Sequence, residues 1–448
     1  MGSINWVDWS IWLVYLMFLG AVVFLVQLNS KKSYSKYLIR GFILKVLGGL
    51  AFALIYVYYY KFGDTFLYFR GASILGDALF NDFYSFTKLL VSEGSQLPPE
   101  LYEYSNSIQY SNASEEWFMI KLLTPLTVLS FSSYLVTTLL MSTLSFIGSW
   151  KLFQVLRDIL PQYERLCFFA AFLIPSALFW GGGIMKDTFT LFGINMLIYC
   201  LYYSVYKKRS KWNLWVGVVV FSLMIFWLKA YVVLVFIPAV MFGFNALLSR
   251  QVGSQFLRYI IATTVLIISV GVLTVLPSIL SQYSDKYQVQ HLQNRVKGFH
   301  TWHSDLGGSA YNLGEVEYTL FGVITKIPAA LNVTFYRPYL WEARNPVVAI
   351  AALESIGFLF LTILAFYRLR FRVFKIIWER PILITFFVYC LIFGFVVGFT
   401  SYNFGALGRY KIPIFSLFTF ILFYLSVKAE VGWVVRFKNK VDQLAKSE

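Results

Sequence analysis

Charged side chains are scarce in this sequence: Asp, Glu, Lys and Arg together make up 13% of its 448 residues. Soluble globular domains have roughly twice that share, about 25%, because a charged surface keeps them in water. Hydrophobic residues reach 58%, and the mean hydropathy is +0.66. The composition therefore excludes a soluble globular protein and predicts an integral membrane protein.

Cysteine is also rare, with three residues that all fall inside apolar segments: Cys167, Cys200 and Cys390. Such positions suit small core residues, so the sequence favours neither a disulfide framework nor a cysteine metal site. Positive charge is missing before Lys31, and this region lacks a small-residue cleavage site. Since the first apolar run is long enough to cross a bilayer, we expect a retained helix and not a signal peptide.

Long apolar runs are what the sequence has in abundance. Crossing a hydrocarbon core of about 30 Å takes about 20 apolar residues, and the lack of backbone partners in lipid makes them helical. We therefore predict an all-α polytopic transmembrane helix bundle, formed as a single membrane domain by residues 1–448. The spans, about eleven, are expected near 6–28, 41–60, 132–156, 166–181, 187–206, 213–228, 231–248, 257–281, 346–367, 381–399 and 411–428.

The formal net charge is +16, but Lys and Arg lie in short clusters between apolar runs. Cytoplasmic loops have this composition under the positive-inside rule. No soluble basic domain is present to bind nucleic acid, so that class of partner is excluded. The alternation of inside and outside loops along the successive spans predicts an outside N-terminus and a cytoplasmic C-terminus. It also predicts long outer loops near 61–131 and 282–345 and short outer turns at 182–186, 229–230 and 400–410. The clusters are Lys31, Lys32, Lys36 and Arg40; Lys207, Lys208, Arg209 and Lys211; and Arg368, Arg370, Arg372, Lys375 and Arg380.

The two long outer loops hold most of the acidic residues and keep apolar stretches at 66–69 and 318–324. We expect these stretches to form amphipathic helices along the membrane surface. The cytoplasmic loops are mostly short and contain few acids. An active site of any size is therefore expected on the outer face.

The first polar motif, GDTFLYFR at 63–70, follows the second predicted span. A carboxylate at this position can act as a general base that takes the proton from an acceptor hydroxyl. It can also bind an ion. Aspartate is equally a preferred helix N-cap, so a structural role for Asp64 stays open.

The second motif, PSALFWGGGIMKDT at 175–188, joins two apolar runs through three glycines. Glycines let a backbone approach a ligand closely, and a lysine at a helix N-terminus suits phosphate. The alternative is a tight turn between helices, with Asp187 as the cap and Lys186 reaching toward the interface.

The third motif, FYRPYLWEARNP at 335–346, places two arginines outside, where the positive-inside rule disfavours them. A lipid phosphate or pyrophosphate would explain them, with Tyr and Trp side chains flanking a sugar. The alternative is an Arg–Glu pair within an aromatic belt.

The fourth motif, NFGALGRYKIP at 403–413, again puts two cations at an outer helix start, and its Asn, Gly and Pro residues mark a shaped turn. Histidine occurs at positions 291, 300 and 303 with no cysteine nearby, so we predict no metal site. A divalent cation remains an open alternative as cofactor.

Asp64 followed by Tyr68 resembles the start of bacterial members of the GT-C superfamily, which are polytopic glycosyltransferases that use polyprenyl-phosphate-linked donors. The segments 175–187, 337–342 and 408–413 are similar to segments common in membrane proteins of bacterial exopolysaccharide and cell-surface glycan clusters. The resemblance spans most of the chain through short motifs. Two departures exist: two spans precede Asp64 where such proteins have one, and Thr65 stands where many have a second acid.

The motifs and the resemblance together predict transfer of a lipid-linked sugar to a glycan or lipid acceptor at the outer face of a bacterial inner membrane. Asp64 would be the catalytic base, and Arg337, Arg409 and Lys411 would hold the donor phosphate. Tyr68, Tyr339 and Trp341 would stack on sugar. The other predicted substrate-binding residues are Arg70, Lys186, Asp187, Glu342 and Asn403.

Two alternatives stay open. The first is a lipid-linked glycan repeat-unit polymerase, which would not need the Asp64 carboxylate. The second is a transporter or a non-catalytic membrane subunit. Coupling-ion sites usually contain intramembrane acids, whereas the expected spans 41–60 and 411–428 contain none, and Glu354 is the exception inside the span that begins near 346.

Overall fold

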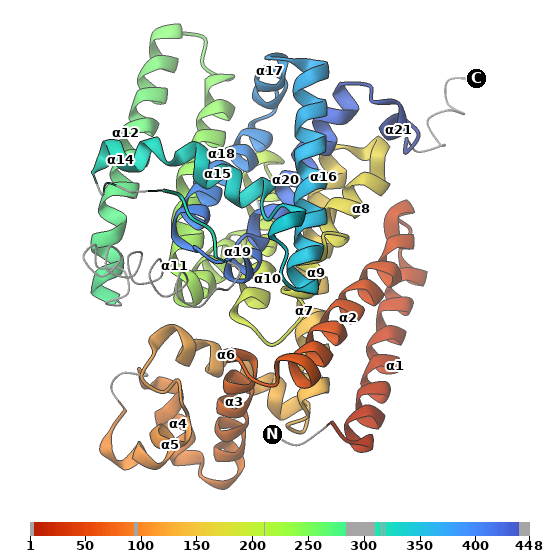
Figure 1. The fold of residues 1–448 in the computed structure, drawn as a ribbon, viewed down its shortest axis with the longest axis vertical. Helices are drawn as coiled ribbons and strands as arrows, with labels where there is room; N and C mark the ends of the chain where they lie inside the picture. The colour runs from red at the N-terminus through yellow and green to blue at the C-terminus, as the bar shows by residue number, and fades with distance from the viewer. Residues whose placement is uncertain are drawn as a thin grey trace. The chain divides into compact units, whose positions relative to one another are not determined.

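A computed structural model shows an all-α helical bundle (Figure 1). It describes residues 4–93, 97–209, 211–283, 310–314, 317 and 319–438. Among these residues the β-structure amounts to one isolated antiparallel bridge between Ala310 and Asn403. The chain divides into two compact units, 1–152 with 177–197 and 219–229, and 153–176 with 198–218 and 230–448. We refer to them as unit 1 and unit 2.

Seven helices in the described part of the chain are long and apolar enough to cross a membrane, and a bent pair of helices raises the number to eight. The chain is therefore a polytopic helical membrane protein. The pair is α19 (Phe404–Tyr410) and α20 (Ile412–Lys428), which meet at 71°. The seven are α1 (Trp6–Asn29), the continuous Ser33–Tyr60 helix, α7 (Tyr134–Ile159), the Lys186–Tyr206 helix, α11 (Trp212–Ser249), α16 (Pro346–Leu369) and α18 (Pro381–Thr400).

The difference from the eleven predicted spans has three sources. The segment expected at 166–181 forms two short helices, α8 (Glu164–Phe172) and α9 (Pro175–Phe179), because a proline disfavours helix in the residue before it. The span expected at 257–281 lies in α12 (Gln255–Tyr283), where the described apolar stretch covers residues 255–269. The spans expected at 213–228 and 231–248 are the two parts of α11, and the predicted turn between them is a break at Lys229, where φ is −156° and ψ is 78°.

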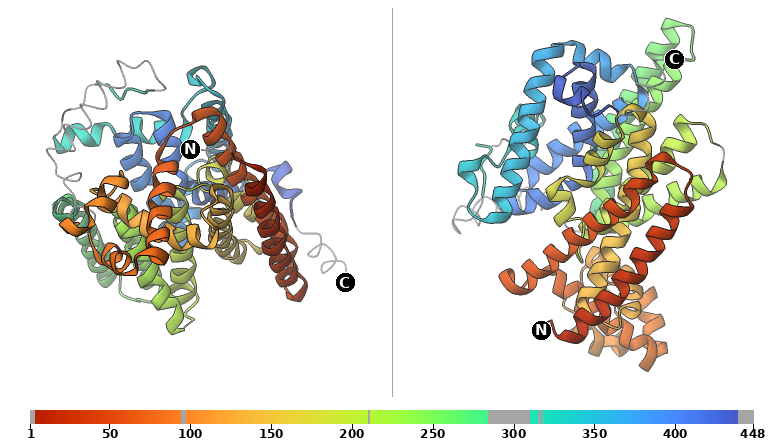
Figure 2. Two further views of the ribbon diagram at one scale, coloured as in Figure 1. Left: turned by 90° about the horizontal axis from the view of Figure 1, so that it is seen from below. Right: turned by 90° about the vertical axis from the view of Figure 1, so that its right-hand side faces the viewer.

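The N-terminal helices of unit 1 are apolar on most of their surface. Helix α1 lies beside α2 (Leu38–Leu54), which continues through the π-helical turn η2 (Ile55–Tyr60) (Figures 1 and 2). Many large apolar side chains of α1 are exposed, and Trp12 is its one buried side chain. A helix with an apolar surface of this extent suits contact with lipid.

The predicted outer loop at 61–131 is largely helical. It contains α3 (Asp64–Asn81), α4 (Phe83–Val91), α5 (Tyr102–Ser107) and α6 (Ser114–Leu129). Helices α3 and α6 pack against each other. Small residues allow the close approach, since a Cβ added at Gly71 would lie 2.7 Å from Ile120 and one at Gly76 would lie 3.0 Å from Val128. This packing fixes the start of α3 relative to the start of α6.

Unit 2 is built around α20, whose side chains are buried on nearly all sides. Helix α18 packs against both α20 and α15 (Ile327–Tyr336). The approach of α15 depends on glycine, because a Cβ added at Gly398 would lie 2.2 Å from the Ala330 carbonyl oxygen. The Thr334 hydroxyl donates to the Gly394 carbonyl at 2.6 Å. Three further short helices are α14 (Leu320–Thr325), α17 (Arg372–Trp378) and α21 (Gly432–Val435).

Candidate functional site

Asp64 is the first residue of α3 and is partly exposed. The chain reaches it through Gly63, whose φ of 133° is a conformation that favours glycine. The N-cap position belongs to Gly63, so Asp64 does not occupy the cap that the structural alternative required. Its Oδ1 accepts a hydrogen bond of 2.8 Å from the Tyr110 hydroxyl. The carboxylate is therefore oriented by a neighbouring tyrosine.

Tyr110 also contacts Tyr68, the second residue of this motif for which the sequence predicted a role. Its ring centroid lies 5.3 Å from that of Tyr68, one turn along α3 from Asp64. Tyr68 is 2% exposed, so its ring packs inside the protein in this structure. Arg70 is exposed. The motif thus contains one partly exposed carboxylate that is hydrogen-bonded to Tyr110, and Tyr68 packs against the ring of that tyrosine.

Lys186, the first residue of α10 (Lys186–Leu201), lies between two carboxylates of α6. Its Nζ is 3.3 Å from Glu115 Oε2 and 2.9 Å from Glu116 Oε1. The lysine is buried, so it does not reach toward the interface as the structural alternative proposed. These acids are in the first turn of α6, where the helix dipole favours negative charge.

Asp187, the next residue, forms a second ion pair. Its Oδ1 accepts a hydrogen bond of 2.5 Å from Lys229 Nζ, and the two side chains are 2% and 7% exposed. Lys229 is the residue at which α11 loses helical geometry. The sequence interpretation missed this lysine, although a single charge within a long apolar run was the available signal.

The three glycines of the second motif make a tight turn against α2. A Cβ added at Gly182 would lie 2.8 Å from the Gly49 backbone nitrogen, and one at Gly183 would lie 2.1 Å from the Phe52 ring. The Gly182 carbonyl accepts a hydrogen bond of 2.8 Å from the Ser142 hydroxyl of α7. These glycines therefore permit close packing between helices, in agreement with the turn alternative.

We call Glu115, Glu116, Lys186, Asp187 and Lys229 of unit 1 the acidic cluster. Three carboxylates face two ammonium groups, which leaves an excess of one negative charge when all are ionised. This balance disfavours a phosphate on Lys186 and favours a hydroxyl donor or a cation. No group of three or more His, Cys, Asp or Glu side chains among the described residues is placed to hold a metal ion.

In unit 2, Arg337 is the centre of a second cluster. Its Nε donates to both Glu342 carboxylate oxygens at 3.1 Å, and its Nη2 donates to Oε1. The guanidinium carbon lies 5.9, 5.8 and 5.3 Å from the ring centroids of Tyr311, Tyr339 and Phe404. The predicted Arg–Glu alternative is therefore present as a contact, and three rings enclose the cation.

Glu342 also orders the segment that follows Arg337. Its Oε2 accepts a hydrogen bond of 2.8 Å from the Tyr339 backbone N–H, at the start of η7 (Leu340–Glu342). Burial opposes the charged form, but the hydrogen bonds from Arg337 and Tyr339 outweigh it and lower the pKa of Glu342. Tyr339 stacks on Trp341 with ring centroids 4.9 Å apart, and Trp341 is 81% exposed. The exposed indole presents an open aromatic face.

Lys411 lies between α19 and α20 and is 1% exposed. Its Nζ donates to the carbonyls of Thr334 at 3.1 Å and Arg337 at 3.2 Å. Glu354 of α16 interacts with this lysine through its charge, and Glu354 Oε2 accepts a hydrogen bond of 2.9 Å from the Ser176 N–H. In this structure Lys411 connects α20 to the end of α15.

Asn403 is the N-cap of α19, and its Oδ1 accepts from the N–H groups of Gly405 and Ala406 at 2.7 and 3.2 Å. Arg409 is near the end of the same helix and is partly buried, with its guanidinium carbon 5.7 Å from the Tyr410 ring centroid. We call Arg337, Tyr339, Glu342, Arg409 and Lys411 the arginine cluster. The structure brings the third and fourth sequence motifs together in it.

Sequence reasoning missed five residues that contact the predicted site residues: Tyr110, Glu115, Glu116, Lys229 and Tyr311. Tyr110 and Tyr311 gave no periodic or motif signal. The three histidines lie outside the described residues. Comparison of the chain with protein-family models, with curated proteins and with solved structures gives no match. The resemblance to the GT-C superfamily therefore depends on the short motifs alone.

Proposed function

We propose that the chain is a membrane glycosyltransferase that moves a sugar from a polyprenyl-phosphate donor to a glycan or lipid acceptor. The reaction would occur at the outer face of a bacterial inner membrane, in cell-surface glycan or exopolysaccharide synthesis. The proposal includes an outside N-terminus and a cytoplasmic C-terminus. The observation that carries it is the partly exposed Asp64 carboxylate, oriented by Tyr110 at the start of α3.

In the proposed reaction, Asp64 takes the proton from the acceptor hydroxyl as its oxygen attacks the anomeric carbon. The bond from that carbon to the donor phosphate breaks, and the polyprenyl phosphate leaves with the electron pair. The Tyr110 hydrogen bond restricts the carboxylate rotamer, and a general base must be held within hydrogen-bond reach of the proton that it abstracts.

The arginine cluster is proposed to bind the phosphate of the lipid donor. Arg337 has Glu342 as a carboxylate partner, and Arg409, partly buried near the end of α19, is the second arginine proposed to contact the phosphate. Lys411 is enclosed and donates to the Arg337 carbonyl. We therefore revise its role from a phosphate ligand to a positioning residue. The exposed Trp341 ring, stacked on Tyr339, is a surface on which a sugar can pack.

Purified protein incubated with a panel of polyprenyl-linked sugars and candidate acceptors tests the proposal. Mass spectrometry should detect a glycosylated acceptor and free polyprenyl phosphate. Absence of transfer with every donor would count against a glycosyltransferase. Products that consist of joined lipid-linked repeat units, formed equally well by Asp64→Asn, would favour the polymerase.

One observation favours the transporter as the second candidate. The Asp187–Lys229 ion pair is buried within apolar helices at the break in α11. Ionisable residues inside membrane segments often mark ion or proton pathways, and broken helices often form transporter sites. Uptake into proteoliposomes that depends on a proton gradient would support this candidate, and it should be lost in Asp187→Asn.

A further inference from the structure

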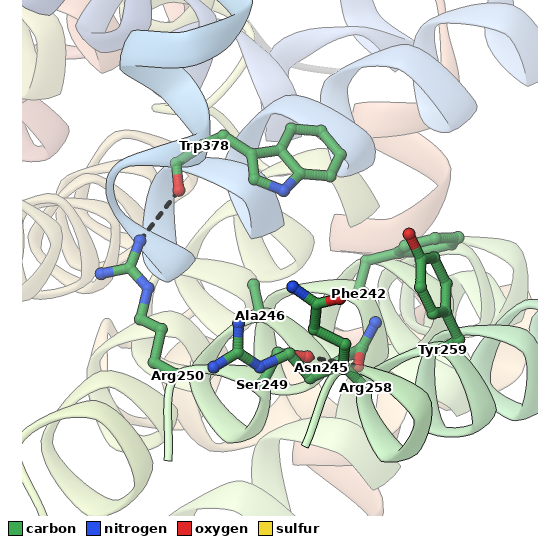
Figure 3. Close-up of a pocket in the computed structure, with 9 residues that line it drawn as sticks. Phe242, Asn245, Ala246, Ser249, Arg250, Arg258, Tyr259 and Trp378 are labelled. Atoms are coloured by element: carbon green, nitrogen blue, oxygen red, sulfur yellow. Dashed lines mark hydrogen bonds between the residues drawn. The ribbon is translucent and has the colours of Figure 1, made fainter. Parts of the chain in front are cut away.

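A cavity of about 530 Å³ lies in unit 2, between the end of α11, the start of α12 and the end of α17 (Figure 3). Its volume falls within the range typical of small-molecule sites, about 300–1,000 Å³. Phe242, Tyr259 and Trp378 supply aromatic walls, and Arg250 and Arg258 supply two positive charges. Neither arginine belongs to the acidic cluster or the arginine cluster.

Both guanidinium groups are oriented by backbone carbonyls. Arg250 Nη2 donates to the Trp378 carbonyl at 2.9 Å (Figure 3). Arg258 Nε donates to the Val252 carbonyl at 2.8 Å. An arginine side chain has five N–H donors in a planar fork. Each guanidinium thus uses one donor for its own positioning, and the rest of the fork suits the oxygens of a phosphate.

The surroundings of the cavity are strongly basic. No acidic residue occurs in 242–259, the segment that contains the lining residues from the end of α11 and the start of α12. The 368–380 segment, which contains Trp378, has one acid, Glu379. That acid is outnumbered by the exposed cations Arg368, Arg370, Arg372, Lys375 and Arg380. An anion is therefore the ligand that the local charge favours.

We propose that this cavity binds the phosphate head group of an anionic phospholipid. The connection between two apolar helices lies at a membrane surface, and the positive-inside rule assigns this basic surface to the cytoplasmic leaflet. Basic pockets between membrane helices on that side recognise anionic lipid head groups. A soluble phosphate ester has the same charged group, but only a lipid also has acyl chains to cover Phe242 and Tyr259.

Native mass spectrometry of the full-length protein, with added phosphatidylglycerol or phosphatidylcholine, tests the proposal. Wild type should retain phosphatidylglycerol preferentially. R250Q/R258Q should bind it at least about 10- to 150-fold more weakly, the effect of losing one charge-assisted hydrogen bond. The matched control K31Q/K32Q removes two exposed charges from another predicted cytoplasmic loop and should bind as wild type does.

The single variant R258Q and the charge-retaining variant R250K/R258K provide the same test should the double variant fail to fold. R258Q should show part of the loss, and the lysine variant should bind between wild type and R250Q/R258Q, because lysine lacks the fork. Unchanged phosphatidylglycerol binding in R250Q/R258Q would overturn the proposal, and so would an equal loss in K31Q/K32Q. Displacement of the lipid by equimolar glycerol phosphate would overturn the assignment to lipid and indicate a soluble phosphate ester.

Discussion

Asp187 and Lys229 form a buried ion pair between the first turn of α10 and the break in α11. Residue 186, directly before this aspartate, forms the two contacts with Glu115 and Glu116. Consecutive residues of one motif therefore hold opposite charges from two other helices of unit 1. This arrangement explains why the Lys-Asp dipeptide stands at the start of an apolar helix.

Removing one member of this pair should destabilise the protein strongly. Asp187→Asn leaves a buried ammonium group without its carboxylate, and breaking a buried pair in this way costs about 3–5 kcal/mol. The double variant Asp187→Asn/Lys229→Gln removes both charges and should recover much of that loss. Thermal unfolding in detergent, followed by tryptophan fluorescence, measures both effects. Equal destabilisation by the single and double variants would show that the two charges are not coupled.

The Asp64 variants separate catalysis from structure. Asp64→Asn keeps the size of the side chain and an oxygen that can accept from Tyr110, but it removes the charge and the basicity. A general base contributes about 10²- to 10⁴-fold to rate, so we expect Asn and Ala variants to lose transfer equally, with little change of melting temperature in Asn. A kinetic assay on purified protein measures this loss.

An ion ligand at Asp64 would also fail in the Asn variant, but excess divalent cation should then restore part of the rate. Normal turnover by Asp64→Asn would rule out the proposed mechanism and put the polymerase and the transporter ahead.

The arginines of the arginine cluster should affect activity more than insertion. One charge-assisted hydrogen bond is worth about 1.5–3 kcal/mol, which corresponds to roughly 10- to 150-fold in rate. We expect losses of this size in Arg337→Ala and in Arg409→Ala, and partial recovery with lysine. Glu342→Gln is the matched control for the ion pair. If Arg337→Ala loses no more activity than Glu342→Gln, the arginine acts only through its carboxylate partner.

The Arg337–Glu342 pair should also make stability depend on pH. The pKa of Glu342 in the folded protein is lowered from its ordinary value of 4.5. The ionised carboxylate is therefore more favourable in the folded protein than in the unfolded chain, and ionisation of Glu342 stabilises the fold. Its contribution is present above pH 4.5 and is lost as the pH falls through the lowered value. Glu342→Gln should therefore melt below wild type at pH 7, and the two curves should converge in acid. Melting scans between pH 7 and pH 3 measure this, and a gap that widens in acid would contradict it.

Cysteine labelling tests the predicted orientation. Leu90→Cys and His300→Cys should react with a membrane-impermeant reagent from outside the cell, and Arg209→Cys should react only after permeabilisation. Leu90 is 39% exposed and Arg209 is exposed, whereas position 300 is outside the described residues. The native cysteines at 167, 200 and 390 are buried and provide a low background. Labelling of position 209 from outside would reverse the assignment of the motifs to the outer face.

The sequence by itself determined that this is an all-α, polytopic membrane protein, because hydropathy over about 20 residues decides whether a helix can be solvated by lipid. It also predicted an interruption near 229–230, where the structure has the break in α11 at Lys229. Hydropathy alone could not determine the number of spans. Pro175 splits one expected span into two short helices, and only the fold showed the 71° bend between α19 and α20.

Only the tertiary structure decided the partners of the charged residues. Lys186 meets Glu115 and Glu116 across about 70 residues of chain, and Asp187 meets Lys229 across 42. Hydropathy and spacing describe neighbours along one helix, whereas these pairs join different helices. Helix packing, made close by glycines such as Gly71 on α3, determines which charges meet. The sequence therefore supplied some residues of the candidate site, and the packing of the helices determined their contacts and added partners such as Tyr110 and Lys229.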